Sequence, residues 1–215
     1  MSRGKFITFE GGEGAGKSTQ VRRLVARLEA AGVEVVSTRE PGGSPGAEAI
    51  RALVLTGSAD RWSPVTETLL MYGARRDHIE RTIIPALERG AWVVCDRFAD
   101  STRAYQGGAG GVAPELIAAL EHHVLAQVRP DLTLVFDLPV EVGLARADTH
   151  ATESGHSETR FESKGAAFHE RLRAAFQQIA AIEPDRCVLV DAADGIEGVD
   201  AAIWAAVTGR LPVHG

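Results

Sequence analysis

Short apolar runs alternate along the chain with longer stretches in which apolar residues recur every three or four positions. The short runs are typical of β-strands, which we expect at residues 6–10, 33–38, 91–96, 132–138 and 187–191. The longer stretches predict helices at residues 17–31, 46–56, 63–90, 114–128, 141–147, 161–182 and 196–207. Pro85 predicts a kink in the third helix, and Gly32 ends the first.

The expected strands are nearly continuous apolar runs, a pattern that favours burial on both faces of a parallel sheet. Strands that alternate with helices predict right-handed βαβ crossovers. We therefore expect a three-layer α/β fold with a five-stranded, mostly parallel sheet. The 215 residues suit a single domain over 1–215. The polar residues 148–159 predict a mobile loop, within a lid insertion at about 147–160.

The strongest local signal is GGEGAGKS at residues 11–18, which follows an expected strand and opens an expected helix. Glycines in such a loop let backbone N–H groups converge on phosphate oxygens, and the helix N-terminus favours anions. Lys17 would reach the β- and γ-phosphates of ATP, and the Ser18 hydroxyl would bind Mg²⁺. The run predicts a P-loop NTPase fold whose ATP-binding residues are Gly11, Gly12, Glu13, Gly14, Ala15, Gly16, Lys17, Ser18 and Thr19.

Polar side chains stand where two other expected strands end, at the sheet edge where open α/β folds bind ligands. Asp96 ends the third strand in the position of an acid that holds Mg²⁺. Arg97 beside it is suited to bidentate contact with an acceptor phosphate. Arg39 follows the second strand, and the pair Arg75 and Arg76 lies on the intervening helix; a solvated surface position is the alternative for each.

Glu13 is unusual inside a P-loop, because a carboxylate there repels phosphates. Its side chain fits if it turns toward a hydrogen-bond donor, for example a sugar hydroxyl of a second substrate. A side chain that points into solvent is equally compatible with the sequence.

The composition of the chain argues against some kinds of binding partner and some locations. The formal net charge of −6 argues against broad nucleic-acid binding, which needs a basic face. Cys95 and Cys187 lie in apolar runs, as buried free thiols do. We find neither a signal peptide nor an apolar run long enough to span a bilayer, and we therefore expect no membrane association and a cytoplasmic location.

Several short runs, taken together in their order and spacing, resemble the bacterial type of the thymidylate kinase family, P-loop kinases of nucleoside monophosphates. The resemblance extends from the first expected strand to the last expected helix. Besides the P-loop with its internal Glu13, it rests on TREPGG at 38–43, DRF at 96–98, ST at 101–102, AYQG at 104–107 and RPDLTL at 129–134.

The resemblance implies roles for individual residues. Arg39 and Arg97 would hold the acceptor phosphate, and Glu13 would face the deoxyribose 3′-hydroxyl. Tyr105 would pack on the sugar and disfavour a 2′-hydroxyl. The remaining acceptor contacts, most of them to the base, would come from Met71, Arg75, Ser101, Thr102 and Gln106. The resemblance further implies a cis Glu40–Pro41 peptide and a homodimer.

The sequence departs from the family pattern at two places. Met71 stands where the family often has a phenylalanine that stacks on thymine. The lid residues 148–159 contain neither Lys nor Arg, so the catalytic cations expected besides Lys17 and Arg97 are the flanking Arg146 and Arg160. His150 and Lys164 are weaker candidates.

These observations predict in-line transfer of a phosphoryl group from MgATP to dTMP, giving ADP and dTDP. Two alternatives remain open at this point. One is another pyrimidine monophosphate kinase that accepts UMP or CMP. The other is a P-loop switch protein that binds GTP, although the N-K-x-D guanine motif of such proteins is absent from the sequence.

Overall fold

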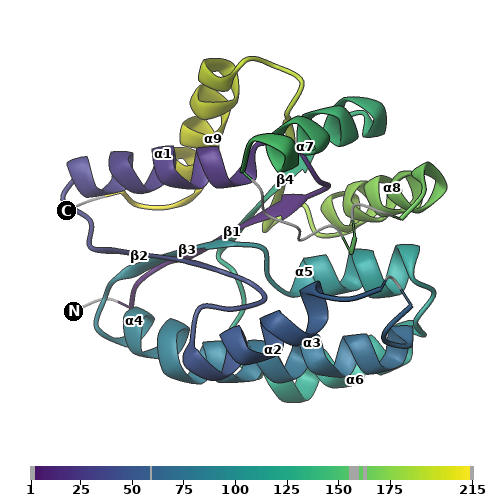
Figure 1. Ribbon diagram of the computed structural model, residues 1–215. Helices are drawn as coiled ribbons and strands as arrows, with labels where there is room; N and C mark the ends of the chain where they lie inside the picture. Colours follow the sequence, from purple (N-terminus) through teal and green to yellow (C-terminus); the bar gives the residue numbers. More distant parts are fainter. Residues whose placement is uncertain (1–2, 59, 155–159, 162–163, 214–215) are drawn as a thin grey trace.

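A computed structural model describes residues 3–58, 60–154, 160–161 and 164–213. Its centre is a five-stranded sheet with the order β2-β3-β1-β4-β5, in which all four strand pairings are parallel (Figure 1). The strands are β1 Phe6–Gly11, β2 Val35–Arg39, β3 Trp92–Asp96, β4 Leu132–Asp137 and β5 Cys187–Asp191. The α/β fold and the sheet expected from the sequence are confirmed.

Helices cover both faces of the sheet and form the outer two layers (Figure 1). They are α1 Lys17–Ala30, α2 Pro45–Leu55, α3 Pro64–His78, α4 Ile84–Glu88, α5 Ala99–Thr102, α6 Pro114–Leu125, α7 Val140–Ser154, α8 Ala166–Ile182 and α9 Ile196–Arg210. Phe9 and Ile7 point from β1 into a core shared with α1 and α9. Phe6 points to the opposite face, where the core includes Ile83 and Leu125.

The long helix expected at 63–90 is interrupted earlier than Pro85. Between α3 and α4 lies a π-helical turn, η1 Ile79–Ile83. Pro85 lacks the N–H that would bond to the carbonyl of Arg81, and a π-turn in the preceding residues accommodates this lost bond. Ser63 begins the helix as expected, because its side chain accepts a hydrogen bond of 3.2 Å from the backbone N–H of Thr66.

The expected loop at 148–159 is wrong for its first half, because α7 continues to Ser154. Within α7 the Thr149 hydroxyl donates to the carbonyl of Ala145, a bond that a threonine inside a helix can make. Residues 155–159, His156 among them, lie outside the described residues, as does the side chain of His150. The next helix begins at Ala166, after Gly165, rather than at 161.

Two elements were not expected from the sequence. Helix α5 follows β3 directly and runs into a second π-helical segment, η2 Arg103–Ala109. Together they carry Thr102, Tyr105 and Gln106 to the carboxyl edge of the sheet. Both cysteines are buried and free, as expected. None of the helices in the described part of the chain is both long and apolar enough to cross a membrane.

Candidate functional site

A cavity of about 900 Å³ opens at the carboxyl ends of β1, β2 and β3, where open α/β sheets bind ligands. This volume lies near the top of the range of about 300–1,000 Å³ that is usual for small-molecule sites. The sequence-predicted residues that line it are Glu13, Gly14, Ala15, Gly16, Lys17, Ser18, Thr19, Arg39, Met71, Arg75, Asp96, Arg97, Ser101, Thr102, Tyr105, Gln106 and Arg146. Gly11, Gly12 and Arg160 do not line it.

The P-loop needs glycine where it contacts α7. Gly14 has a left-handed backbone with φ of 64°, and a Cβ atom there would lie 2.0 Å from the carbonyl oxygen of Gly143 in α7. Gly16, with φ of 83°, makes the turn into α1. The loop is thereby held against the start of α7, with the N-terminus of α1 facing the cavity.

Lys17 lies folded across the P-loop. Its Nζ donates to the carbonyl oxygens of Gly11 at 3.1 Å and Gly12 at 2.7 Å. Burial, together with the nearby guanidinium of Arg97, lowers the pKa of Lys17 to about 8. Gly11 and Gly12 thus hold the lysine rather than line the cavity.

Ser18 and Asp96, the two residues expected to bind Mg²⁺, lie next to each other. The Ser18 hydroxyl donates to the Asp96 carboxylate at 2.6 Å. Among the described residues there is no group of three or more His, Cys, Asp or Glu side chains that could hold a metal ion. Mg²⁺ suits such a sparse site, because it usually keeps several waters and takes further oxygens from substrate phosphates.

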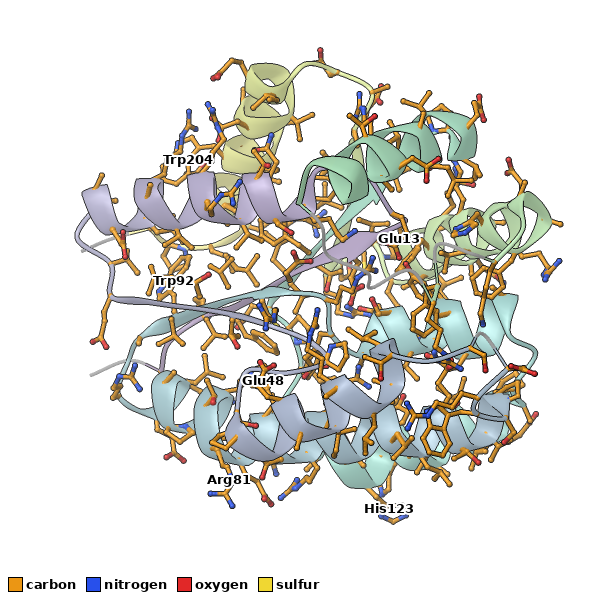
Figure 2. The ribbon with its side chains drawn as sticks, in the orientation of Figure 1. Glu13, Glu48, Arg81, Trp92, His123 and Trp204 are labelled. Carbon is orange, nitrogen blue, oxygen red and sulfur yellow. The ribbon has the colours of Figure 1, made fainter. Side chains whose placement is uncertain are left out.

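Glu13 turns away from the phosphate loop toward two donors. Figure 2 shows it between α7 and α8 on one side and α5 on the other. Both of its carboxylate oxygens lie 3.2 Å from the Arg97 guanidinium, and the Tyr105 hydroxyl donates to it at 2.5 Å. Burial alone would raise the pKa of Glu13, but Arg97 and Lys17 outweigh burial and lower it.

Arg97 is fixed on its other side as well. It donates to the carbonyl of Gly11 at 2.9 Å and to the Ser101 hydroxyl at 3.3 Å. Its backbone φ of 69° is uncommon for a residue with a side chain, and aims that side chain back toward β1. The guanidinium stacks over the Tyr105 ring at 5.0 Å.

Glu10 holds the segment that follows Arg97 in place. Sequence reasoning did not identify it. It is fully buried at the end of β1, where it accepts bonds from the N–H of Phe98 at 2.8 Å, the N–H of Ser101 at 3.2 Å and the Ser101 hydroxyl at 2.6 Å. Burial, and next the charge of Asp100, raise the pKa of Glu10 to about 8. No local pattern marks it, because its partners lie about ninety positions along the chain.

We expect Glu10→Gln to flatten the pH dependence of stability. The folded protein holds a proton on Glu10 up to about pH 8, whereas the unfolded chain releases it near 4.5. The unfolding free energy therefore falls as pH rises through this interval, and a neutral amide removes that slope. Glutamine keeps the acceptor for both N–H groups and donates to Ser101 in place of accepting. Urea unfolding at pH 5, 6, 7 and 8 measures the slope; equal slopes in both proteins would contradict the expectation.

Arg75 is the centre of a hydrogen-bonded cluster in the part of the cavity lined by α3, α5 and η2. This buried side chain donates to Glu40 at 2.7 Å, to the Thr102 hydroxyl at 3.1 Å and to the carbonyl of Phe98 at 2.9 Å. Gln106, also buried, donates to Glu67 at 2.8 Å. The apolar part of this region is formed by Leu55, Met71, Phe161 and Tyr105, whose ring lies edge-on to that of Phe161. The peptide bond between Glu40 and Pro41 is cis, as expected.

Arg39 at the end of β2 and Arg51 of α2 also line the cavity. Arg39 is exposed and lies 3.4 Å from Glu48 of α2. Arg51, which the sequence analysis did not single out, lines the same side and donates to the carbonyl of Pro41 at 2.7 Å. The position of Arg51 in an amphipathic helix gives no signal of its own.

The two arginines that flank the expected lid, Arg146 and Arg160, have different surroundings in the structure. Arg146 lines the cavity and donates to the carbonyl of Ala192 at 3.3 Å. Arg160 is instead buried in an ion pair with Glu67 and donates to the carbonyl of Val54. We therefore correct the expectation for Arg160: in this structure its charge is used to join the lid to α2 and α3.

Comparison with known proteins is consistent with this geometry. A family model described as thymidylate kinase matches residues 9–203. The chain is 64% identical over 211 residues to a thymidylate kinase of Caulobacter vibrioides, covering 98% of this chain and 99% of that protein. It is 55% identical to a thymidylate kinase of Bradyrhizobium sp. (strain ORS 278), covering 97% and 92%. A crystal structure of thymidylate kinase from Ehrlichia chaffeensis superposes with a TM-score of 0.76 at 34% identity, covering 96% of this chain and 99% of that one.

Proposed function

The chain belongs to the thymidylate kinase family, and from that premise we propose that it transfers the terminal phosphoryl group of ATP to dTMP, giving ADP and dTDP. The observation that carries the proposal is the shared cavity. The P-loop, Ser18 and Asp96 line it together with Arg75 and with Arg97, whose guanidinium bonds to the P-loop at Gly11 and Glu13. One cavity that can hold a donor and an acceptor nucleotide fits direct transfer between them.

At the donor end, the backbone N–H groups of the P-loop bind the phosphates of ATP, and Lys17 donates to the β- and γ-phosphate oxygens. Ser18 and Asp96 are the residues that hold Mg²⁺, which neutralises phosphate charge when it is bound with ATP. Arg146 supplies a further positive charge from α7, a role supported by its place in the cavity lining. The acceptor phosphate is already an anion and needs no strong general base.

At the acceptor end, Arg97 and Arg39 bind the phosphate of dTMP. Glu13 accepts from the 3′-hydroxyl of the sugar, and Tyr105 fills the space that a 2′-hydroxyl would need. Support for this pairing comes from the bonds that join Glu13, Arg97 and Tyr105. Donation by Arg75 to a thymine carbonyl, with Thr102, Gln106, Ser101 and Met71 around the base, orients the ring.

The expected location is the cytoplasm. The two free, buried cysteines favour a compartment in which thiols stay reduced.

The proposal is tested by a coupled ADP-release assay with MgATP and separate acceptors dTMP, dUMP, UMP, CMP, AMP and GMP. We expect turnover with dTMP to exceed turnover with every ribonucleotide. Turnover confined to UMP or CMP would overturn the choice of acceptor and leave the kinase assignment in place. ATP hydrolysis that no monophosphate accelerates would overturn the transfer itself.

We further propose that the protein forms a homodimer through α2 and α3. Three large apolar side chains are exposed on these two neighbouring helices: Leu53 at 43%, Val65 at 46% and Leu69 at 49%. Exposed apolar side chains gathered on one part of a surface favour an interface between copies. Burial of the same residues in both copies would give a two-fold dimer.

Leu69→Asp is expected to shift the dimer toward monomer, because it places a charge in the apolar contact. The matched control is Ile196→Asp, which alters an apolar residue on α9, across the sheet, that is somewhat more exposed, at 58%. Sedimentation equilibrium of both variants measures the association constant. A wild-type monomer, or equal association of the two variants, would contradict the interface.

A further inference from the structure

His78 ends α3 behind the acceptor half of the cavity and is not one of its lining residues. The imidazole is completely buried, and both ring nitrogens have partners. Its Nδ1 lies 2.9 Å from the carboxylate of Glu40, and its Nε2 lies 2.8 Å from the hydroxyl of Thr38. A buried ring bonded at both nitrogens has one orientation, since any rotation breaks a buried hydrogen bond.

Glu40 links His78 to Arg75, so the fixed orientation of the imidazole also fixes the Arg75 side chain. One Glu40 oxygen is bonded to His78, and the other accepts from Nε of Arg75 at 2.7 Å. Arg75 then uses one N–H on each terminal nitrogen, for Thr102 and for the carbonyl of Phe98. A guanidinium has five N–H groups in a rigid fork, so these bonds fix the direction of the remaining two.

His78 also supports the loop that joins β2 to α2. Gly43 in that loop lies so close to the ring that a Cβ atom would be 2.4 Å from His78 Nε2 and 2.4 Å from the Thr38 hydroxyl. The carbonyl of Gly43 accepts a bond of 2.7 Å from Thr82, one turn beyond His78. One buried ring therefore contacts both the Arg75 support and the loop that follows Arg39.

We propose that His78 is a specificity-determining positioning residue for the acceptor nucleotide. It does not touch the acceptor; it holds Glu40, and through Glu40 it aims the guanidinium of Arg75 at the carbonyl of a pyrimidine base. The inference rests on the proposed function, because it requires that the acceptor base lie against Arg75. It adds a residue outside the cavity to those that set the choice of base.

Two substitutions at His78 each keep one of its two hydrogen bonds and remove the other. Asparagine places an amide near the position of Nδ1 and keeps donation to Glu40, whereas glutamine reaches the position of Nε2 and keeps the contact with Thr38. His78→Gln is expected to raise KM for dTMP about tenfold, as the loss of one buried polar partner implies. The ratio of kcat/KM for dTMP over dCMP falls by a similar factor. His78→Asn is expected to change both quantities less than His78→Gln does.

The binding of each substrate is measured separately, by calorimetry with dTMP alone and with a non-hydrolysable ATP analogue alone. We expect the analogue to bind both variants as it binds the wild-type protein, because the P-loop does not contact His78. The surface control is His123→Gln on α6, whose side chain lies at the outer edge of the molecule (Figure 2). It is expected to alter neither binding nor melting temperature.

The outcomes are distinct. If His78→Gln folds and keeps the KM and base selectivity of the wild type, or if the two variants weaken dTMP and ATP binding alike, His78 has only a structural role and the proposal fails. If His78→Gln does not fold, Thr38→Val takes its place, with an expected rise of about threefold in KM for dTMP alone; an unchanged KM refutes the proposal. A wild-type protein that phosphorylates a different pyrimidine monophosphate, with the same dependence on His78, would overturn the proposed acceptor and retain the positioning role.

Discussion

Lys17→Met is expected to lower kcat by about 10³-fold and to leave the protein as stable as the wild type. The loss follows from removing the cation that neutralises the transferring phosphoryl group, an effect of about 10²–10³-fold for a single preorganised donor in an active site. Stability is expected to persist because burial of the ammonium is costly, as its lowered pKa of about 8 indicates. Methionine has similar length and no charge to desolvate.

Steady-state kinetics and thermal unfolding of the same preparations check this prediction. Lys5→Met serves as the matched control, because Lys5 lies just before β1, at the opposite end of the strand from the P-loop. A kcat for Lys17→Met within tenfold of the wild type would show that the phosphate contacts are made elsewhere. A large loss of stability would show that Lys17 holds the loop rather than the substrate.

Arg97→Ala is expected to reduce kcat/KM for dTMP by about 10³-fold and to destabilise the fold by about 3 kcal/mol. Activity falls because the substitution removes the guanidinium that binds the acceptor phosphate. The stability is lost because Glu13 keeps its half-buried carboxylate without the guanidinium that holds its pKa low. Alanine retains the side-chain carbon, so the strain of the left-handed backbone is the same in both proteins.

The double variant Arg97→Ala with Glu13→Gln distinguishes the two effects. Neutralising Glu13 removes the unpaired charge, so we expect stability to return toward that of the wild type while activity stays low. Urea unfolding and kinetics with dTMP measure both quantities in one series. Activity that returns together with stability would mean that Arg97 acts only through the fold and not on the acceptor.

The parts of the site that the sequence predicts are those with local signals. The P-loop is a contiguous motif between a strand and a helix, and Asp96 and Arg97 stand at the end of an apolar run. Parallel strands bring such ends to one edge of the sheet, so the Ser18–Asp96 pair follows from topology once the strands are known. Most acceptor residues came from the family resemblance and not from periodicity.

The parts that the sequence did not predict depend on contacts between distant residues. Glu10 and His78 are buried polar groups whose partners lie far along the chain, and no spacing pattern reveals them. Arg160 was expected near the phosphates because it flanks the lid in sequence, but its ion pair with Glu67 forms only once α3 and the lid are packed. The loop expected at 148–159 rests on the polarity of these residues, and polarity alone does not show that α7 continues to Ser154.

The central claim, direct transfer between two nucleotides in one cavity, is tested most directly by following the γ-phosphorus of labelled ATP. The wild-type protein is mixed with [γ-³²P]ATP, Mg²⁺ and dTMP, and the nucleotides are separated as the reaction proceeds. The account predicts that label appears in dTDP in a one-to-one ratio with ADP, with little release as inorganic phosphate. Label that appears mainly as inorganic phosphate, at a rate independent of dTMP, would contradict it.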